Sequence, residues 1–96
     1  MTSNKHLQDL YQLLLKAKTS QELAHLLEDI LTPQELHSIA ERWQIIQALL
    51  KNEPQRDIAE KLNTSIGKIT RGSRVVQFGK VDWKKYIEDP GDSKDM

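Results

Sequence analysis

The chain of 96 residues contains no cysteine, which excludes a disulfide framework, a thiol nucleophile and a thiolate metal site. No uninterrupted apolar run approaches the ~20 residues that a helix needs to cross a bilayer. The first ten residues, MTSNKHLQDL, lack a basic region followed by an apolar stretch, so they do not resemble a signal peptide. We therefore expect a soluble cytoplasmic protein that does not act on a membrane.

The groups that catalysis would need are also missing. The three histidines, His6, His25 and His37, are not spaced to lie on one helix face as metal ligands. The sequence has no glycine-rich phosphate-binding loop either. It therefore predicts a protein that is not an enzyme and binds no metal.

Neither sign of charge is in excess, because 14 basic residues balance 14 acidic ones. The charges are nevertheless segregated: residues 51–85 carry nine basic and four acidic groups, whereas the segments on either side are net acidic. Between Thr64 and Val81 the charged residues are Lys68, Arg71, Arg74 and Lys80, with no acid among them. This block could contact a phosphate backbone, although four cations can also form a solvated helix face.

Helical periodicity runs along nearly the whole chain, and no segment alternates long enough to predict a strand. We expect about six helices, with starts marked by capping residues such as Thr19 and Thr32. The helix after Thr32 should present an apolar stripe suited to packing against another helix: Leu36, Ile39, Trp43, Ile46 and Leu50. The fold class is therefore all-α, with one domain over residues 1–88 and a disordered acidic tail over residues 89–96.

Residues 54–77 have the pattern of two short helices joined by a tight turn. The apolar residues expected in their common core are spaced four and three apart: Ile58 and Leu62, then Ile66 and Ile69. Asn63 stands at the turn, and asparagine tolerates the left-handed conformation. This pattern is typical of a helix-turn-helix, whose second helix lies in the DNA major groove, although a helical hairpin can also be plain packing.

The solvent side of this hairpin favours DNA binding, because it carries donors able to reach bases or phosphates: Gln55, Arg56, Lys68, Thr70, Arg71 and Arg74. A chain of this length buries only a small core by itself. Because the first three helices also present apolar faces, we expect an intertwined homodimer.

The stretches LTPQELHSIAERWQIIQALL and PQRDIAEKLNTSIGKITRGSR resemble the tryptophan repressor family, dimeric bacterial regulators that bind operator DNA when charged with L-tryptophan. The resemblance covers about residues 29–77. It rests on LTP, an arginine about ten residues later, QR at the start of the hairpin and ITRGS in its second helix. It implies a sequence-specific repressor, with double-stranded operator DNA as partner and L-tryptophan as corepressor.

The resemblance also implies a ligand pocket. Arg42 and Arg71 match two arginines that sandwich the indole ring, and guanidinium planes stack well on aromatic faces. Leu31 and Thr32 match the pocket floor. Gly72 matches a position where a side chain would intrude on the ligand. Because glycine inside a helix costs about 1 kcal/mol relative to alanine, we expect alanine at this position to leave the protein no less stable.

Two departures from the family pattern concern the ligand. Val75 stands where the family has a serine that contacts the ligand's amino group, and Asp29 stands where an apolar residue is usual. Losing one hydrogen bond to a charged amine should cost about 1.5–3 kcal/mol, although Asp29 could be a replacement acceptor. A regulator of this type with a different effector, or with none, is therefore an alternative.

The family's base contacts map onto Arg56 and onto the first turn of the second hairpin helix. With the exposed donors included, the candidate DNA-binding residues are Gln55, Arg56, Ile66, Gly67, Lys68, Thr70 and Arg74. Arginine can donate two hydrogen bonds to guanine, worth about 1–3 kcal/mol of discrimination. The alternative from another class is a protein-interaction module that uses the hairpin only for packing and binds no DNA.

Overall fold

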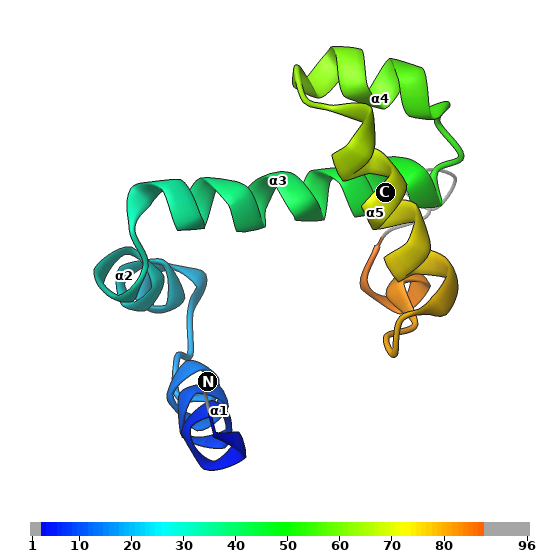
Figure 1. Ribbon diagram of the computed structural model, residues 1–96. Helices are drawn as coiled ribbons and strands as arrows, with labels where there is room; N and C mark the ends of the chain where they lie inside the picture. The colour runs from blue at the N-terminus through cyan, green and yellow to red at the C-terminus, as the bar shows by residue number, and fades with distance from the viewer. Residues whose placement is uncertain (1–2, 88–96) are drawn as a thin grey trace, which may run out of the picture. The chain divides into compact units, whose positions relative to one another are not determined.

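The computed structural model describes residues 3–87, and all regular structure within them is helical (Figure 1). In chain order the elements are α1 (Asn4–Leu15), α2 (Ser20–Ile30), α3 (Pro33–Leu50), α4 (Gln55–Leu62), α5 (Ile66–Phe78) and a short 3-10 helix, η1 (Trp83–Tyr86). The all-α prediction with about six helices is confirmed. The acidic tail predicted over residues 89–96 lies outside the described residues.

The helices begin at the capping residues that the sequence predicts. Thr32 Oγ1 accepts a hydrogen bond from the Glu35 amide at 3.1 Å, and Glu35 Oε1 accepts one from the Thr32 amide at 2.9 Å, which is a reciprocal capping box. At the start of α2, Thr19 Oγ1 accepts from the Glu22 amide at 3.0 Å, whereas Glu22 Oε1 accepts from the Lys18 amide. Local sequence therefore fixes both helix starts.

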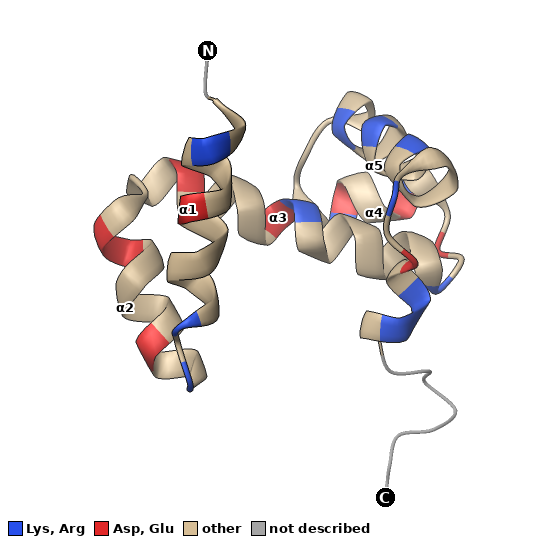
Figure 2. Ribbon diagram, turned by 90° about the horizontal axis from the view of Figure 1, so that it is seen from below, with Lys and Arg blue, Asp and Glu red and all other residues tan. Residues whose placement is uncertain are grey.

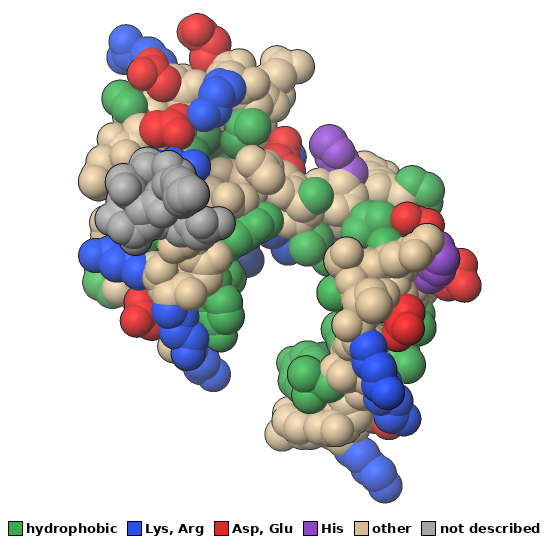
Figure 3. Space-filling model, turned by 180° about the vertical axis from the view of Figure 1, so that it is seen from behind, with side chains coloured by type: hydrophobic (Ala, Val, Ile, Leu, Met, Phe, Trp, Pro, Cys, Tyr) green, Lys and Arg blue, Asp and Glu red, His purple; other side chains and the backbone are tan. Residues whose placement is uncertain are grey.

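The chain forms two compact units, Met1–His37 and Ser38–Met96. In the first unit, which contains α1 and α2, no side chain of residues 3–37 is buried. Several large apolar side chains there are exposed: Tyr11, Leu15 and Ile30. Figure 3 shows apolar side chains in green on the surface. The prediction of a single domain over residues 1–88 stays a prediction.

The second unit contains a hydrophobic core where α4 and α5 gather around the C-terminal half of α3 (Figure 1). Ile58 of α4 and Ile69 of α5 are 0% exposed, and Ile45 of α3 is 2% exposed. Asn63 turns the chain between α4 and α5 with a φ of 53°, in the left-handed region. The predicted helix-turn-helix and its asparagine turn are therefore confirmed.

The prediction that Ile66 lies in the core is wrong, and the buried residues of α3 differ from its predicted apolar stripe. Ile66 is 50% exposed, because it is the first residue of α5 and no helical turn precedes it for its side chain to cover. On α3 the predicted stripe includes Ile39, which is 49% exposed, and omits Ile45 and Ala48, which are buried. Periodicity identifies an apolar face, but it does not identify which neighbouring residue faces α4 and α5.

The segment after α5 packs on α3 through aromatic side chains. The ring centroids of Trp83 and Trp43 lie 5.8 Å apart, and those of Trp83 and Tyr86 lie 6.4 Å apart. Trp43, part of the predicted apolar stripe of α3, thus packs against η1. Within residues 3–87, no helix combines the length and apolar character needed to span a membrane, and no three acidic or histidine side chains gather as metal ligands.

Candidate functional site

A pocket of about 270 Å³ lies between α3 and α5, close to the lower limit of about 300 Å³ for small-molecule sites in proteins. Its lining comes entirely from the second unit and consists of Ser38, Glu41, Arg42, Ile45, Ile46, Lys68, Arg71, Gly72 and Val75. The pocket is therefore lined by apolar side chains together with three cations and one carboxylate. Such a lining suits a small molecule that has both an apolar part and charged groups.

Four of the six predicted ligand-binding residues line this pocket: Arg42, Arg71, Gly72 and Val75. The other two belong to the first unit, where Leu31 is the C-cap residue of α2 and Thr32 caps the start of α3. Neither is among the residues that line the pocket. Asp29, considered above as a replacement acceptor, also lies in the first unit.

Gly72 has a packing role that the sequence alone does not reveal. A Cβ atom at this position would lie 2.7 Å from Ile45 Cγ2 and 3.3 Å from Leu49 Cδ1. Ile45 belongs to the core and its Cγ2 atom is not the end of a flexible side chain, so it cannot move away cheaply. Glycine therefore lets α5 approach α3 closely, with or without a ligand. This geometry argues against the expectation that alanine here would leave the protein no less stable, and we now expect it to be destabilising.

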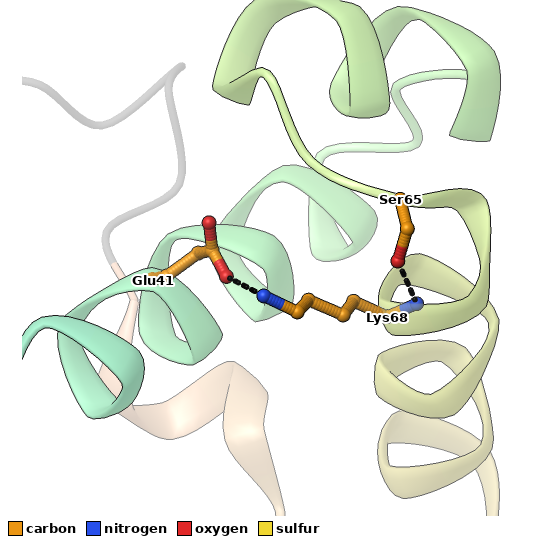
Figure 4. Close-up of polar contacts among 3 residues, drawn as sticks. All are labelled: Glu41, Ser65 and Lys68. Carbon is orange, nitrogen blue, oxygen red and sulfur yellow. Dashed lines mark hydrogen bonds and ion pairs between the residues drawn. The ribbon is translucent and has the colours of Figure 1, made fainter. Parts of the chain in front are cut away.

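An ion pair joins α3 to α5 in the lining of the pocket. Lys68 Nζ donates a hydrogen bond to Glu41 Oε1 at 3.1 Å (Figure 4). The Glu41 side chain is 14% exposed and the Lys68 side chain 60% exposed. The Lys68 amide also donates to Ser65 Oγ at 3.3 Å, which caps α5. The sequence predicts a DNA contact for Lys68 but gives no sign of its partner Glu41, because a contact between residues 27 positions apart leaves no local signal.

The predicted DNA-binding residues are all exposed and lie on the two hairpin helices. Gln55 and Arg56 begin α4, and the others follow along α5: Ile66, Gly67, Lys68, Thr70 and Arg74. Thr70 Oγ1 lies 3.5 Å from Gln55 Oε1, so the start of α4 is next to the second turn of α5. Figure 2 shows the basic residues of α5 in blue, and no acidic residue occurs on that helix.

The family model described as Trp repressor protein matches residues 5–90. The Trp operon repressor homolog of Mannheimia succiniciproducens is 42% identical over 64 residues, which is 66% of this chain and 63% of that protein. The homolog of Actinobacillus succinogenes is 38% identical over 66 residues, 68% of this chain and 65% of that protein. These matches thus span slightly less than two thirds of either relative.

A third similar protein covers more of the chain. The Trp operon repressor homolog of Chlamydia trachomatis serovar D is 35% identical over 89 residues, 92% of this chain and 78% of that protein. This similarity extends well beyond the hairpin and includes the helices of the first unit.

Proposed function

The chain belongs to the Trp repressor family, and on that premise we propose that it is a transcriptional repressor that binds operator DNA as a dimer, with L-tryptophan as corepressor. One observation carries the proposal: α5 has an exposed, acid-free surface, and the same helix lines a pocket with Arg42 of α3 through its own Arg71. A ligand in that pocket would touch the helix that contacts DNA. The protein would act as a regulator in the cytoplasm and not as an enzyme.

In the proposed DNA complex, α5 lies in the major groove. Helix-turn-helix proteins contact base edges with the N-terminal residues of the second helix, which here are Ile66, Gly67 and Lys68. Arg56 would contribute from the start of α4. Arg74, two turns further along α5, would contact the phosphate backbone, which fixes register without reading sequence.

In the proposed ligand complex, the indole ring of tryptophan lies between Arg42 and Arg71, and its carboxylate meets a guanidinium group. Ile45, Ile46 and Val75 supply apolar contacts from the pocket lining. A ligand held between α3 and α5 would favour one angle between these helices. Corepression then follows if tryptophan binds the DNA-competent arrangement more tightly than others.

Arg56→Ala is expected to relax base discrimination by about 1–3 kcal/mol, because the substitution removes a side chain able to bond a guanine edge. Arg74→Ala should instead weaken binding to all duplexes. The slope of log K against the logarithm of salt concentration should become shallower by about 0.9, the change expected when one phosphate contact is lost. The measurement is a fluorescence anisotropy titration of labelled duplexes at several salt concentrations, with and without L-tryptophan. Lys61→Ala on α4 is the control, because Lys61 pairs with Glu53 at 2.7 Å and is not a candidate DNA contact.

Each alternative function gives a different result in these titrations. Weak binding to every duplex that does not depend on salt would indicate a protein-interaction module that uses the hairpin only for packing. Strong, salt-dependent binding that L-tryptophan does not change would indicate a regulator with another effector or none. Only tighter binding in the presence of L-tryptophan supports the whole proposal.

The proposed dimer predicts that folding depends on protein concentration. No side chain of residues 3–37 is buried within the chain, so burying their apolar surface against a second copy would stabilise the first unit. We expect the thermal midpoint to rise between about 1 and 100 μM protein, with sedimentation showing a dimer. A folded monomer at micromolar concentration, with a midpoint that does not change, would contradict the dimer.

A further inference from the structure

Among the residues that line the pocket, all within the described part of the chain, Glu41 is the one carboxylate. Arg42, Lys68 and Arg71 line the same pocket. Three cations surround a single anion, so the lining attracts a ligand carboxylate strongly and offers one place for a positively charged group. That place is the Glu41 side chain, which is 14% exposed and bonded to Lys68.

We propose that Glu41 accepts the ammonium group of an amino-acid ligand, and that this contact releases Lys68 to bind DNA. The inference rests on the proposed function, since it requires an amino acid in the pocket and DNA on α5. It adds a specificity-determining residue and a physical link between ligand and DNA.

Glu41 suits an ammonium group better than the other residues of the lining. Val75 has no polar atom, and the Ser38 hydroxyl, although it can accept a hydrogen bond, carries no charge to balance a cation. A bond between two ionised groups is shorter and roughly twice as strong as one between neutral groups. Because the Glu41 side chain is largely shielded from water, its attraction for a cation is weakened less by solvent than that of an exposed carboxylate.

The ligand ammonium competes with Lys68 for the same carboxylate. Lys68 Nζ bonds Glu41 Oε1, and a second cation on this carboxylate would repel the first and weaken its hold. The Lys68 side chain is 60% exposed and its residue lies in the first turn of α5, the part of a recognition helix that contacts DNA. Once freed, Lys68 adds a positive charge next to the phosphates. By linkage, DNA must then favour ligand binding equally.

The test of the ammonium contact compares L-tryptophan with indole-3-propionic acid, which lacks the amino group. By isothermal calorimetry, the wild type should bind L-tryptophan at least about tenfold more tightly. Glu41→Gln keeps the shape of the side chain and removes its charge, and should bind the two compounds within about threefold. The ratio of two affinities does not depend on how much of the variant is folded, so partial unfolding cannot produce this result.

The test of Lys68 release uses a duplex selected for binding to the wild type, without ligand. Glu41→Gln should bind it more tightly than the wild type, with a salt slope steeper by about 0.9. In a Lys68→Gln background, the same Glu41 substitution should leave DNA affinity unchanged, because the side chain to be released is absent. Glu53→Gln is the matched control: it makes the same charge change in the Glu53–Lys61 pair, which joins the loop between α3 and α4 to α4, outside the pocket.

The outcomes separate this inference from the proposed function. A wild type that binds neither L-tryptophan nor DNA would overturn the proposed function and this inference with it. A wild type that binds both, with a Glu41→Gln variant that still prefers L-tryptophan by tenfold, would overturn Glu41 as the ammonium acceptor alone. If Glu53→Gln raised DNA affinity as much as Glu41→Gln, the gain would be a general charge effect and Lys68 release would be wrong.

Discussion

Ile69→Ala is expected to lower the free energy of unfolding by about 2–5 kcal/mol, the usual cost of truncating a fully buried isoleucine. Ile69 is 0% exposed and packs in the core with Ile45, Ala48 and Ile58. Its truncation would leave a cavity where α3, α4 and α5 meet, and the surrounding helices can fill it only in part. Urea unfolding followed by circular dichroism, at one fixed protein concentration, measures the loss.

Ile66→Ala is the matched control, since it makes the same chemical change three residues earlier on α5. Ile66 is 50% exposed, so the substitution removes much less buried surface than Ile69→Ala and should lower the free energy of unfolding by about 1 kcal/mol or less. It should instead weaken DNA binding if Ile66 contacts bases from the first turn of the helix. Equal destabilisation by the two substitutions would show that α5 presents a different face to the core.

Gly72→Ala is expected to destabilise the protein by about 1–2 kcal/mol, although alanine favours a helix by up to about 1 kcal/mol over glycine. The added Cβ would lie 2.7 Å from Ile45 Cγ2, and overpacking a close-packed core costs about 1–3 kcal/mol. Packing therefore outweighs helix propensity at this position. The measurement is again urea unfolding at fixed protein concentration.

Gly67→Ala is the matched control for Gly72→Ala, and its effect on stability should be absent or of the opposite sign. A Cβ at Gly67 would have Ser65 Oγ, 3.8 Å away, as its nearest neighbour, which is an ordinary contact. Alanine there should leave stability unchanged or raise it by up to about 1 kcal/mol. Combining Gly72→Ala with Ile45→Leu, which removes the Cγ2 branch, should cost less than the sum of the two single changes. A Gly72→Ala variant as stable as Gly67→Ala would contradict the close approach of α5 to α3.

The parts of the fold that sequence predicts well are those in which neighbouring residues determine the structure. Thr32 and Glu35 cap α3 reciprocally, three positions apart, and Asn63 adopts the left-handed conformation at the turn between α4 and α5. Both follow from the chemistry of a single turn of chain. The helix starts and the helix-turn-helix could therefore be read from the residues alone.

The parts that sequence could not predict depend on residues far apart in the chain. The core role of Ile45 and the need for glycine at Gly72 both arise because α5 crosses α3 closely. The Glu41–Lys68 pair likewise joins residues 27 positions apart. Arg42 and Arg71 were matched to a pocket through the family resemblance, and the structure brings them together in its lining. Helical periodicity alone does not show which residues far apart in the sequence come into contact.

The aromatic pair between α3 and η1 determines which changes in the structure the tryptophan fluorescence of this protein can detect. The chain has two tryptophans, and their rings lie 5.8 Å apart, with the Trp83 Nε1 atom buried and without a hydrogen-bond partner. Tryptophan emission therefore originates from one place in the structure, where the two indoles are close enough to exchange excitation energy. A shift in tryptophan emission would record the lifting of η1 from α3, whereas a change within α1 or α2, which contain no tryptophan, would have to be followed through Tyr11 of α1 or an introduced fluorophore.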